Sequence, residues 1–255
     1  EDDSEKNNDK DLNNTKNTQI CLFLIESILL DALKMRGYYP DFVAGHSLGE
    51  ITALYAAKVI SFDNCVSLIK VRSELMSKAP TGSMAALIGF DRDVLENLVE
   101  NKDDIFIAND NSASQVVLSG NKDTLDEISK EIKCKRFIHL NVSGAFHSCY
   151  MNEPSKKFSE YLDSVNFSEP FIPVISNAKP SFSKDSIQLK QNLKMQMCNG
   201  VRWRETMDLM NTANDLHIIE IGPSSVLGGL AKRHLKNIKI SQVSSANNLL
   251  YESNE

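Results

Sequence analysis

The sequence predicts an α/β protein with a smaller α/β unit inserted into it. Short apolar strand patterns alternate with longer helical patterns on both sides of residues 84–140. Strands that lead through a glycine turn into a helix are typical of parallel sheets. Residues 84–140 follow a different order of strand, helix, two strands, helix and strand. With 255 residues, the chain can bury enough apolar surface to fold without disulfides or a structural metal.

The composition argues against several classes of protein. The net charge of −6 disfavours a nucleic-acid-binding protein, because phosphate contacts need a basic face. No apolar run approaches the roughly 18 residues of a membrane span, so we expect no membrane association. The 5 cysteines form no CxxC pair and the 5 histidines are dispersed, which predicts reduced thiols and no metal site.

The first segment of the chain has no structural pattern. Residues 1–18 are polar and charged without hydrophobic periodicity, which predicts a disordered or loop head. They contain neither an initiator Met nor a signal or transit pattern, so we expect the chain to begin partway through its gene product. Apolar residues at helical spacing then predict a helix that ends at Gly37.

The next segment predicts a short strand and two helices. The apolar run Phe42–Ala44 is strand-like and leads into a glycine-flanked turn. Small and apolar residues from Ile51 to Ala57 predict a buried helix. A further helix is predicted from Phe62 to Lys78, and Pro80-Thr81-Gly82 ends it.

The inserted unit, residues 84–140, has the split βαββαβ order of ferredoxin-like folds. Asp91 is a predicted N-cap, and Asn109-Asp110-Asn111-Ser112 is predicted as a polar turn between two strands. The predicted strands are Met84–Phe90, Ile105–Ala108, Val116–Ser119 and Lys135–Leu140, and the helices run from Asp91 to Glu100 and from Lys122 to Ile132.

After the insert, α/β signals resume, so residues 19–83 and 141–255 are predicted to form one large unit. The strictly apolar strand Leu216–Ile221 ends at Gly222-Pro223 and feeds a helix, which is typical of a parallel sheet. The other predicted elements are a strand at Phe171–Ile175 and helices at Asn152–Leu162, Asp185–Met197, Trp203–Asn211 and Ser225–Leu235.

The strongest chemical signal is Gly45-His46-Ser47-Leu48-Gly49, which fits the nucleophile-elbow pattern G-x-S-x-G. An apolar run precedes it and a helical pattern follows, as that turn requires. The flanking glycines avoid clashes of a Cβ in the tight turn, which presents the Ser47 hydroxyl at a helix N-terminus. The N–H of Leu48 is then a natural oxyanion donor. A chance Gly/Ser turn is the alternative interpretation.

A serine nucleophile needs a base, and His147 is the strongest of the histidines. It lies in the loop Val142–Ser148 among small residues, and loops often carry catalytic groups. His46 adjoins the serine, and neighbours on such a turn point apart, so packing beside the elbow is favoured for it. The remaining histidines, which we expect in strands or on a solvated helix end, are His139, His217 and His234.

Two further features suggest a binding role. Arg72 lies on the helix after the elbow in a chain where arginine is much rarer than lysine, which indicates that the planar guanidinium matters. Such a group binds a carboxylate through two hydrogen bonds. The stretch Gln196–Trp203 contains the single tryptophan and would by itself indicate packing.

Taken together, these motifs resemble the malonyl-CoA:acyl carrier protein transacylases and the acyltransferase domains of polyketide and fatty acid synthases. They occur in the order of that family from about Leu12 to Val243. The matching motifs are Gly45-His46-Ser47-Leu48-Gly49-Glu50, Val71-Arg72, Gly82-Ser83-Met84-Ala85-Ala86, Asn111-Ser112 with Gln115-Val116-Val117, Gly144-Ala145-Phe146-His147-Ser148, Gln196–Trp203 and Glu220-Ile221-Gly222-Pro223. The implied fold is an α/β-hydrolase-like core with a parallel sheet and a nucleophile elbow, plus the ferredoxin-like insert.

The resemblance implies a role for each motif. Ser47 attacks the malonyl thioester, and His147 serves as its base and later as acid and base. A main-chain carbonyl orients this histidine in the family, and Gln196 matches the residue that supplies it. Arg72 is implied to clamp the malonyl carboxylate, and Phe146 resembles the malonyl-selective pattern. Further substrate-binding residues are implied at Leu48, His46 and Asn111.

The chain departs from the family pattern in two places. No segment resembles the family's Gly- and Gln-rich loop, whose glutamine helps to form the oxyanion hole, and it would lie upstream of Glu1. Ser224 stands where the family usually has glycine, a change that the sequence does not explain.

Two alternatives remain open. A thioesterase or lipase on a similar elbow would have an acidic residue late in the chain and no carboxylate clamp. A degenerate scaffold or carrier-binding module would have kept the fold without the chemistry, and intact Ser47, His147 and Arg72 speak against it.

The resemblance also implies the partners. They are malonyl-CoA, CoA and an acidic acyl carrier protein that brings its own phosphopantetheine, with no other cofactor, no nucleic acid and no membrane. Basic residues on the last predicted helix, Lys232, Arg233 and Lys236, are candidates for carrier docking. We expect a soluble monomer. Because the composition reflects AT-rich codons, a plastid (apicoplast-like) or mitochondrial location is preferred to the bacterial cytoplasm.

Overall fold

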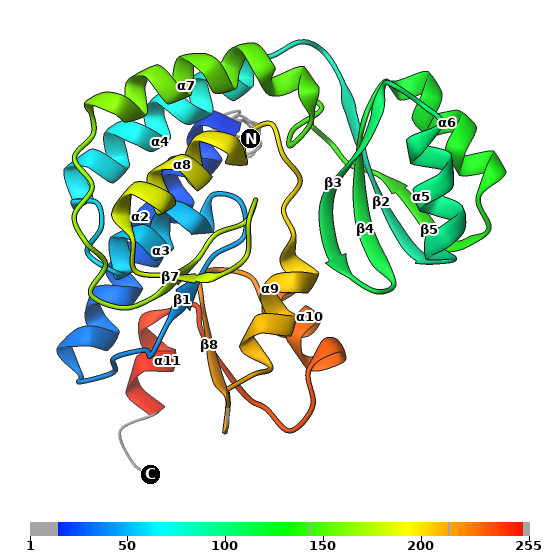
Figure 1. Cartoon of the computed structure of the whole chain (residues 1–255). Helices are drawn as coiled ribbons and strands as arrows, with labels where there is room; N and C mark the ends of the chain where they lie inside the picture. Colours follow the sequence, from blue (N-terminus) through cyan, green and yellow to red (C-terminus); the bar gives the residue numbers. More distant parts are fainter. Residues whose placement is uncertain (1–14, 143, 214, 252–255) are drawn as a thin grey trace, which may run out of the picture.

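Two α/β units lie side by side in the computed structural model, which describes residues 15–142, 144–213 and 215–251 (Figure 1). The larger unit contains both described ends of the chain, and the smaller one forms the separate green body on the right of the view. Within the predicted head, residues 15–18 are helical, so the prediction is wrong for them. Residues 1–14 lie outside the described part of the chain.

The larger unit begins with three helices around a hydrophobic core. They are α2 (Thr15–Met35), α3 (Gly49–Ala56) and α4 (Phe62–Ser77). The Ser61 side chain caps α4 by accepting a hydrogen bond from the backbone N–H of Asn64. Fully buried residues such as Phe23, Ile51 and Leu68 hold these helices against the later helices α7 (Asn152–Ser164) and α8 (Ser186–Gln196). The boundaries follow the predicted elements closely.

The strands of the larger unit form two small sheets in the described residues. In the first, β1 (Val43–Ala44) pairs in parallel with β6 (Val174–Ile175), and β6 pairs antiparallel with β7 (Phe182–Ser183). In the second, β8 (His217–Ile221) pairs in parallel with β9 (Lys239–Val243). The first sheet is therefore mixed and the second is parallel, whereas the sequence predicted a parallel sheet and no strands at β7 and β9.

The remaining helices cover these sheets and the core. The 3-10 turn η1 (Cys149–Met151) leads into α7, and the helices are α7 (Asn152–Ser164), α8 (Ser186–Gln196), α9 (Trp203–Met210), α10 (Val226–His234) and α11 (Ala246–Tyr251). Helix α11 was not predicted. The backbone carbonyl of Ser224 accepts a hydrogen bond from Gln242, a contact that does not depend on the side chain at position 224.

The smaller unit is a four-stranded antiparallel sheet with strand order β3-β4-β2-β5 and two helices. Its elements are β2 (Ser83–Phe90), α5 (Arg92–Glu100), β3 (Ile105–Ser112), β4 (Gln115–Gly120), α6 (Lys122–Glu131) and β5 (Cys134–His139). The predicted turn at residues 109–112 is wrong, because these residues extend β3. A separate hydrophobic cluster that includes Leu87, Leu95 and Leu118 fills the space between sheet and helices.

The extension of β3 joins the two units. The N–H of Asp110 donates to the carbonyl of Val201 at 2.9 Å, and the N–H of Val201 donates to that of Ala108 at 2.8 Å. A Cβ on Gly200 would lie 2.4 Å from the carbonyl oxygen of Ile107, so only glycine permits this close approach. Polar residues of β3 are thereby carried to the larger unit. Within the described part of the chain, no helix is long and apolar enough to cross a membrane.

Candidate active site

Ser47 lies on a sharp turn between β1 and α3. Its φ of 53° falls in the left-handed region, which is costly for any residue with a side chain. A Cβ on Gly45 would lie 1.9 Å from the carbonyl oxygen of Gly49, so the turn requires glycine at position 45. The same expectation for Gly49 is wrong, because a Cβ there meets nothing within 4 Å. Leu48 follows Ser47 as the N-cap of α3, and its side chain is buried.

His147 faces Ser47 from the loop after β5. Its Nε2 lies 2.8 Å from the Ser47 hydroxyl, and its Nδ1 lies 2.9 Å from the main-chain oxygen of Gln196. Because a carbonyl only accepts, Nδ1 carries the proton in the neutral ring and Nε2 is left as the acceptor for the serine proton. His147 also has a left-handed φ, of 57°. The two reacting side chains are thus both held by strained backbone.

Arg72 projects from α4 to the same point and is buried, with only 1% of its surface exposed. Its Nη2 donates to the Ser47 hydroxyl at 3.1 Å and to Gln196 Oε1 at 3.0 Å, and its Nη1 donates to Gln19 Oε1 at 2.5 Å. Its Nε has no hydrogen-bond partner among the described residues. A buried guanidinium without a directly bonded carboxylate is well suited to bind an anionic group of a ligand.

The electrostatics keep His147 neutral. Burial and, to a smaller extent, the positive charge of Arg72 lower the pKa of His147 to about 3. A neutral imidazole is the form that can accept a proton from a serine hydroxyl. Burial also lowers the pKa of Arg72 to about 10, while the nearby charge of Glu50 raises it. Arg72 therefore stays a cation at neutral pH.

Sequence reasoning assigned no role to three residues that hold this group together, although one of them, Glu50, stands in the elbow motif. Asn177 follows β6, and its Oδ1 accepts from the Ser47 N–H at 2.7 Å while its Nδ2 donates to the Gly45 carbonyl at 2.7 Å. Glu50, on α3, is 1% exposed. Gln19, on α2, bonds Arg72. Because β1 and β6 are parallel, their carboxyl ends meet, so a polar residue just after β6 was the signal for Asn177.

The predicted residues His46 and Asn111 meet beside the elbow. His46 Nε2 lies 2.9 Å from Asn111 Oδ1, and the His46 ring packs edge-on against Trp203 with centroids 5.5 Å apart. Burial lowers the pKa of His46, against the opposing effect of the Asn111 hydrogen bond. These residues flank Ser47 without a hydrogen bond to its side chain in the described structure. Their substrate-binding role stays a prediction.

Phe146 is buried, whereas the basic residues at the end of α10 are exposed. Phe146 is buried in the large hydrophobic cluster, and a Cβ on Gly144 would lie 2.8 Å from its ring. The role of Phe146 in selectivity stays a prediction. Lys232, Arg233 and Lys236 are exposed at and after the end of α10. His234 contacts Asp208 at 2.7 Å and takes no part in the site.

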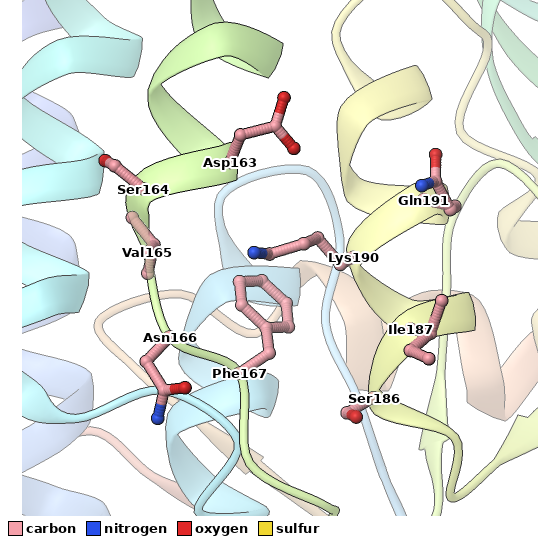
Figure 2. Close-up of a pocket in the computed structure, with 9 residues that line it drawn as sticks. All are labelled: Asp163, Ser164, Val165, Asn166, Phe167, Ser186, Ile187, Lys190 and Gln191. Atoms are coloured by element: carbon pink, nitrogen blue, oxygen red, sulfur yellow. The ribbon is translucent and has the colours of Figure 1, made fainter.

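Two pockets in the described residues lie away from Ser47. The one in Figure 2 has a volume of about 360 Å³ and lies between the C-terminal end of α7 and α8, with Lys190 Nζ 5.1 Å from the centroid of the Phe167 ring. The other, of about 500 Å³, is lined by Asp31, Lys34 and Lys58 among others. Among the described side chains, no group of three or more His, Cys, Asp or Glu could hold a metal ion.

Comparison with known proteins gives a consistent result. Residues 5–249 match the family model described as acyl transferase domain. The chain is 43% identical over 235 residues to a malonyl CoA-acyl carrier protein transacylase of Synechocystis sp., covering 92% of this chain and 80% of that protein. It is 37% identical to the Staphylococcus aureus protein of the same name, over 91% of this chain and 78% of the relative.

Solved structures show the same α/β fold with mixed sheets. The crystal structure of the Synechocystis malonyl-CoA:ACP transacylase aligns with a TM-score of 0.92 and 42% identity, covering 94% of this chain and 82% of that chain. A malonyl-transacylase in complex with a type II polyketide synthase acyl-carrier protein aligns with a TM-score of 0.89 and 30% identity, covering 95% and 82%. The match across nearly the whole chain means that this protein belongs to the acyl transferase family.

Proposed function

We propose that this protein transfers the malonyl group from malonyl-CoA to the phosphopantetheine thiol of acyl carrier protein, in fatty acid biosynthesis. The observation that carries the proposal is the convergence on the Ser47 hydroxyl of His147 Nε2 at 2.8 Å and the buried Arg72 guanidinium at 3.1 Å. With His147 as the base, Ser47 can form an acyl-serine. The neighbouring Arg72 cation selects an acyl group that bears a carboxylate. The names and structures of the relatives support the same substrates.

The first half-reaction loads the serine. His147 Nε2 takes the proton of Ser47 as Oγ attacks the thioester carbonyl carbon of malonyl-CoA. The N–H of Leu48, at the start of α3, donates to the oxyanion of the tetrahedral intermediate. The C–S bond then breaks, the proton on His147 passes to the departing CoA sulfur, and malonyl-Ser47 remains. Gln196 supports each step, because its main-chain oxygen holds the Nδ1 proton of the histidine.

The second half-reaction removes the malonyl group from Ser47. The thiol of the carrier's phosphopantetheine gives its proton to His147 and attacks the ester carbonyl of malonyl-Ser47. The bond from the carbonyl carbon to Oγ breaks, and the proton returns from His147 to Oγ. This ping-pong cycle uses the residues in the same positions twice and needs no cofactor beyond the phosphopantetheine that the partner carries.

The same geometry separates this proposal from a serine hydrolase. In a Ser-His-Asp triad the histidine is oriented by a carboxylate, whereas His147 is oriented by a main-chain carbonyl. A cation bonded to the nucleophile has no role in releasing an uncharged fatty acyl group. A non-catalytic scaffold has no reason to keep the two strained residues in bonding distance. The hydrolase and scaffold alternatives are therefore less well supported.

Mass spectrometry of the loaded protein tests the proposal. Incubation with malonyl-CoA is expected to add one malonyl mass to the peptide that contains Ser47, and addition of holo acyl carrier protein is expected to remove it. The matched control is Ser148→Ala, because Ser148 is a buried serine of the same loop as His147 that bonds only to backbone. The absence of an adduct, or an adduct that water removes as fast as the carrier does, would sink the proposal.

The two units of the chain correspond to two subdomains of different fold. We infer an α/β-hydrolase-like large subdomain, residues 19–83 and 141–255, and a ferredoxin-like small subdomain, residues 84–140. The strand order β3-β4-β2-β5 and the separate hydrophobic cluster support the second assignment. Parallel pairing of β1 with β6 beside the elbow supports the first.

The relatives named above are bacterial, and nothing supports the plastid or mitochondrial location expected from codon bias.

A further inference from the structure

We propose that Glu50 is the positioning residue of this site, holding the nucleophile, the histidine partner and the carboxylate clamp in one arrangement. The proposal rests on the transfer function proposed above and deepens it. Glu50 is the second residue of α3, directly after the elbow, and only 1% of its surface is exposed. Burying a carboxylate is costly unless the surrounding groups require its charge.

One oxygen of Glu50 bonds the two residues that hold Ser47. Glu50 Oε2 accepts from Gln196 Nε2 at 2.8 Å and from the main-chain N–H of Asn177 at 3.2 Å. Asn177 in turn accepts from the Ser47 N–H, and Gln196 Nε2 donates to the Ser47 carbonyl at 2.7 Å. The backbone of the nucleophile is therefore held on both sides by groups that converge on Glu50.

Glu50 also determines which way the Gln196 amide faces. The two N–H groups of this amide point to Ser47 and Glu50, and its oxygen accepts from Arg72 at 3.0 Å. The amide dipole thus lies between a negative and a positive charge, and its reversal would place oxygen against carboxylate and N–H against guanidinium. Because the main-chain oxygen of the same residue orients His147, a turned Gln196 disturbs the histidine as well.

The charge of Glu50 has a second effect, on Arg72. Burial raises the pKa of Glu50 to about 7, and the hydrogen bonds from Gln196 and Asn177 and the charge of Arg72 oppose this rise by favouring the ionised form. The charge of Glu50 in turn raises the pKa of Arg72 against the lowering effect of burial. A partly compensated Arg72 binds the malonyl carboxylate less strongly than an uncompensated one. Glu50 therefore weakens the binding of the malonyl carboxylate in the ground state, and in return it fixes the geometry of the site. Its removal is expected to lower kcat without weakening substrate binding.

The test compares Glu50→Gln and Glu50→Asp with the wild-type protein. Glu50→Gln keeps the shape but removes the charge, and we expect kcat for malonyl transfer to fall at least tenfold while KM for malonyl-CoA stays equal or falls. Glu50→Asp keeps the charge but shortens the reach to Gln196, so we expect a similar fall in kcat with an unchanged KM. The matched control is Glu26→Gln, a partly buried glutamate on α2 that bonds Thr52 and lies outside the site.

The outcomes separate this inference from the proposed function. If the wild-type protein forms no malonyl-Ser47, the function itself fails. If the wild type transfers malonyl but either Glu50 variant keeps kcat within tenfold, the positioning role is wrong. A rise in KM in parallel with the fall in kcat would also overturn it, because general damage to the site weakens binding too. Should Glu50→Gln not fold, Glu50→Asp alone decides by the same criteria.

Discussion

At the scale of single residues, the site depends on a few buried polar groups that are almost fully paired. Arg72, Glu50 and Gln196 are each 1% exposed, and every one of them is bonded to another member of the group. Such a network is stable only when complete, because removing one partner leaves another buried and unsatisfied. Single substitutions are therefore expected to change several properties together.

Replacement of Arg72 by alanine tests the carboxylate clamp. We expect malonyl transfer to fall roughly 10²-fold or more, because a buried carboxylate is left without its cation, while activity with acetyl-CoA rises relative to malonyl-CoA. The measurement is kcat/KM for both thioesters. Equal losses for the two substrates would show that Arg72 does not read the carboxylate.

The same variant also reports on the histidine. Because burial and the charge of Arg72 both lower the pKa of His147, the acid limb of kcat/KM for acetyl-CoA is expected well below pH 6.5 in the wild type. Loss of the positive charge raises the pKa of His147, so the acid limb of Arg72→Ala should move to higher pH. A limb that stays in place would mean that another group controls it.

At the scale of elements, polar residues of β3 connect the two units beside the site. Asp110 bonds Arg92 of α5 at 2.8 Å and Arg204 of α9 at 2.9 Å, so one carboxylate bridges the small and the large unit. The next residue, Asn111, bonds His46 next to the nucleophile. This contact exists because residues 109–112 continue the strand, where the sequence had predicted a turn. Asparagine and aspartate favour turns locally, and pairing with β4 and Val201 overrides that preference.

A double-mutant cycle measures this bridge. We expect Asp110→Ala and Arg204→Ala to show a coupling of about 0.5–1 kcal/mol in urea unfolding at low salt, since both side chains are partly exposed. The coupling should shrink in 0.5 M NaCl because salt screens partly exposed charges. The control is the pair Arg202 and Glu205, which lies within one exposed turn and bridges no units. A coupling no larger than that of the control would contradict a role in joining the units.

At the scale of the whole molecule, the net charge of −6 means that an acidic partner needs a local basic surface, and Lys232 and Arg233 lie exposed next to each other at the end of α10. Charge reversal at Lys232 and Arg233 is expected to raise KM for the carrier several-fold, more at low salt, with KM for malonyl-CoA unchanged. Lys130→Glu is the matched control, because Lys130 is exposed in the last turn of α6 in the other unit. If both variants change KM for the carrier equally, docking does not use the end of α10.

Much of this molecule could be predicted from the sequence because its local signals agree. Glycine-flanked Ser47, the Asp91 cap and the apolar periodicity of α4 each specify their element within a few residues. Strands β7 and β9 were missed because their sequences, Phe-Ser and Lys-Ile-Ser-Gln-Val, contain no continuous apolar run, unlike the segments around β1 and β6. Glu50 and Asn177 were missed because their role arises only when α3 and the end of β6 meet, which no local pattern encodes.

The left-handed backbone at Ser47 and His147 has a consequence for protein engineering. Each position bears a cost of about 1–2 kcal/mol that glycine would relieve, and only the side chain justifies the cost. Selection for heat resistance alone therefore favours glycine at Ser47 and His147, the two positions that carry the chemistry. Libraries for this chain need a catalytic selection alongside the thermal one, or the most robust descendants will be inert.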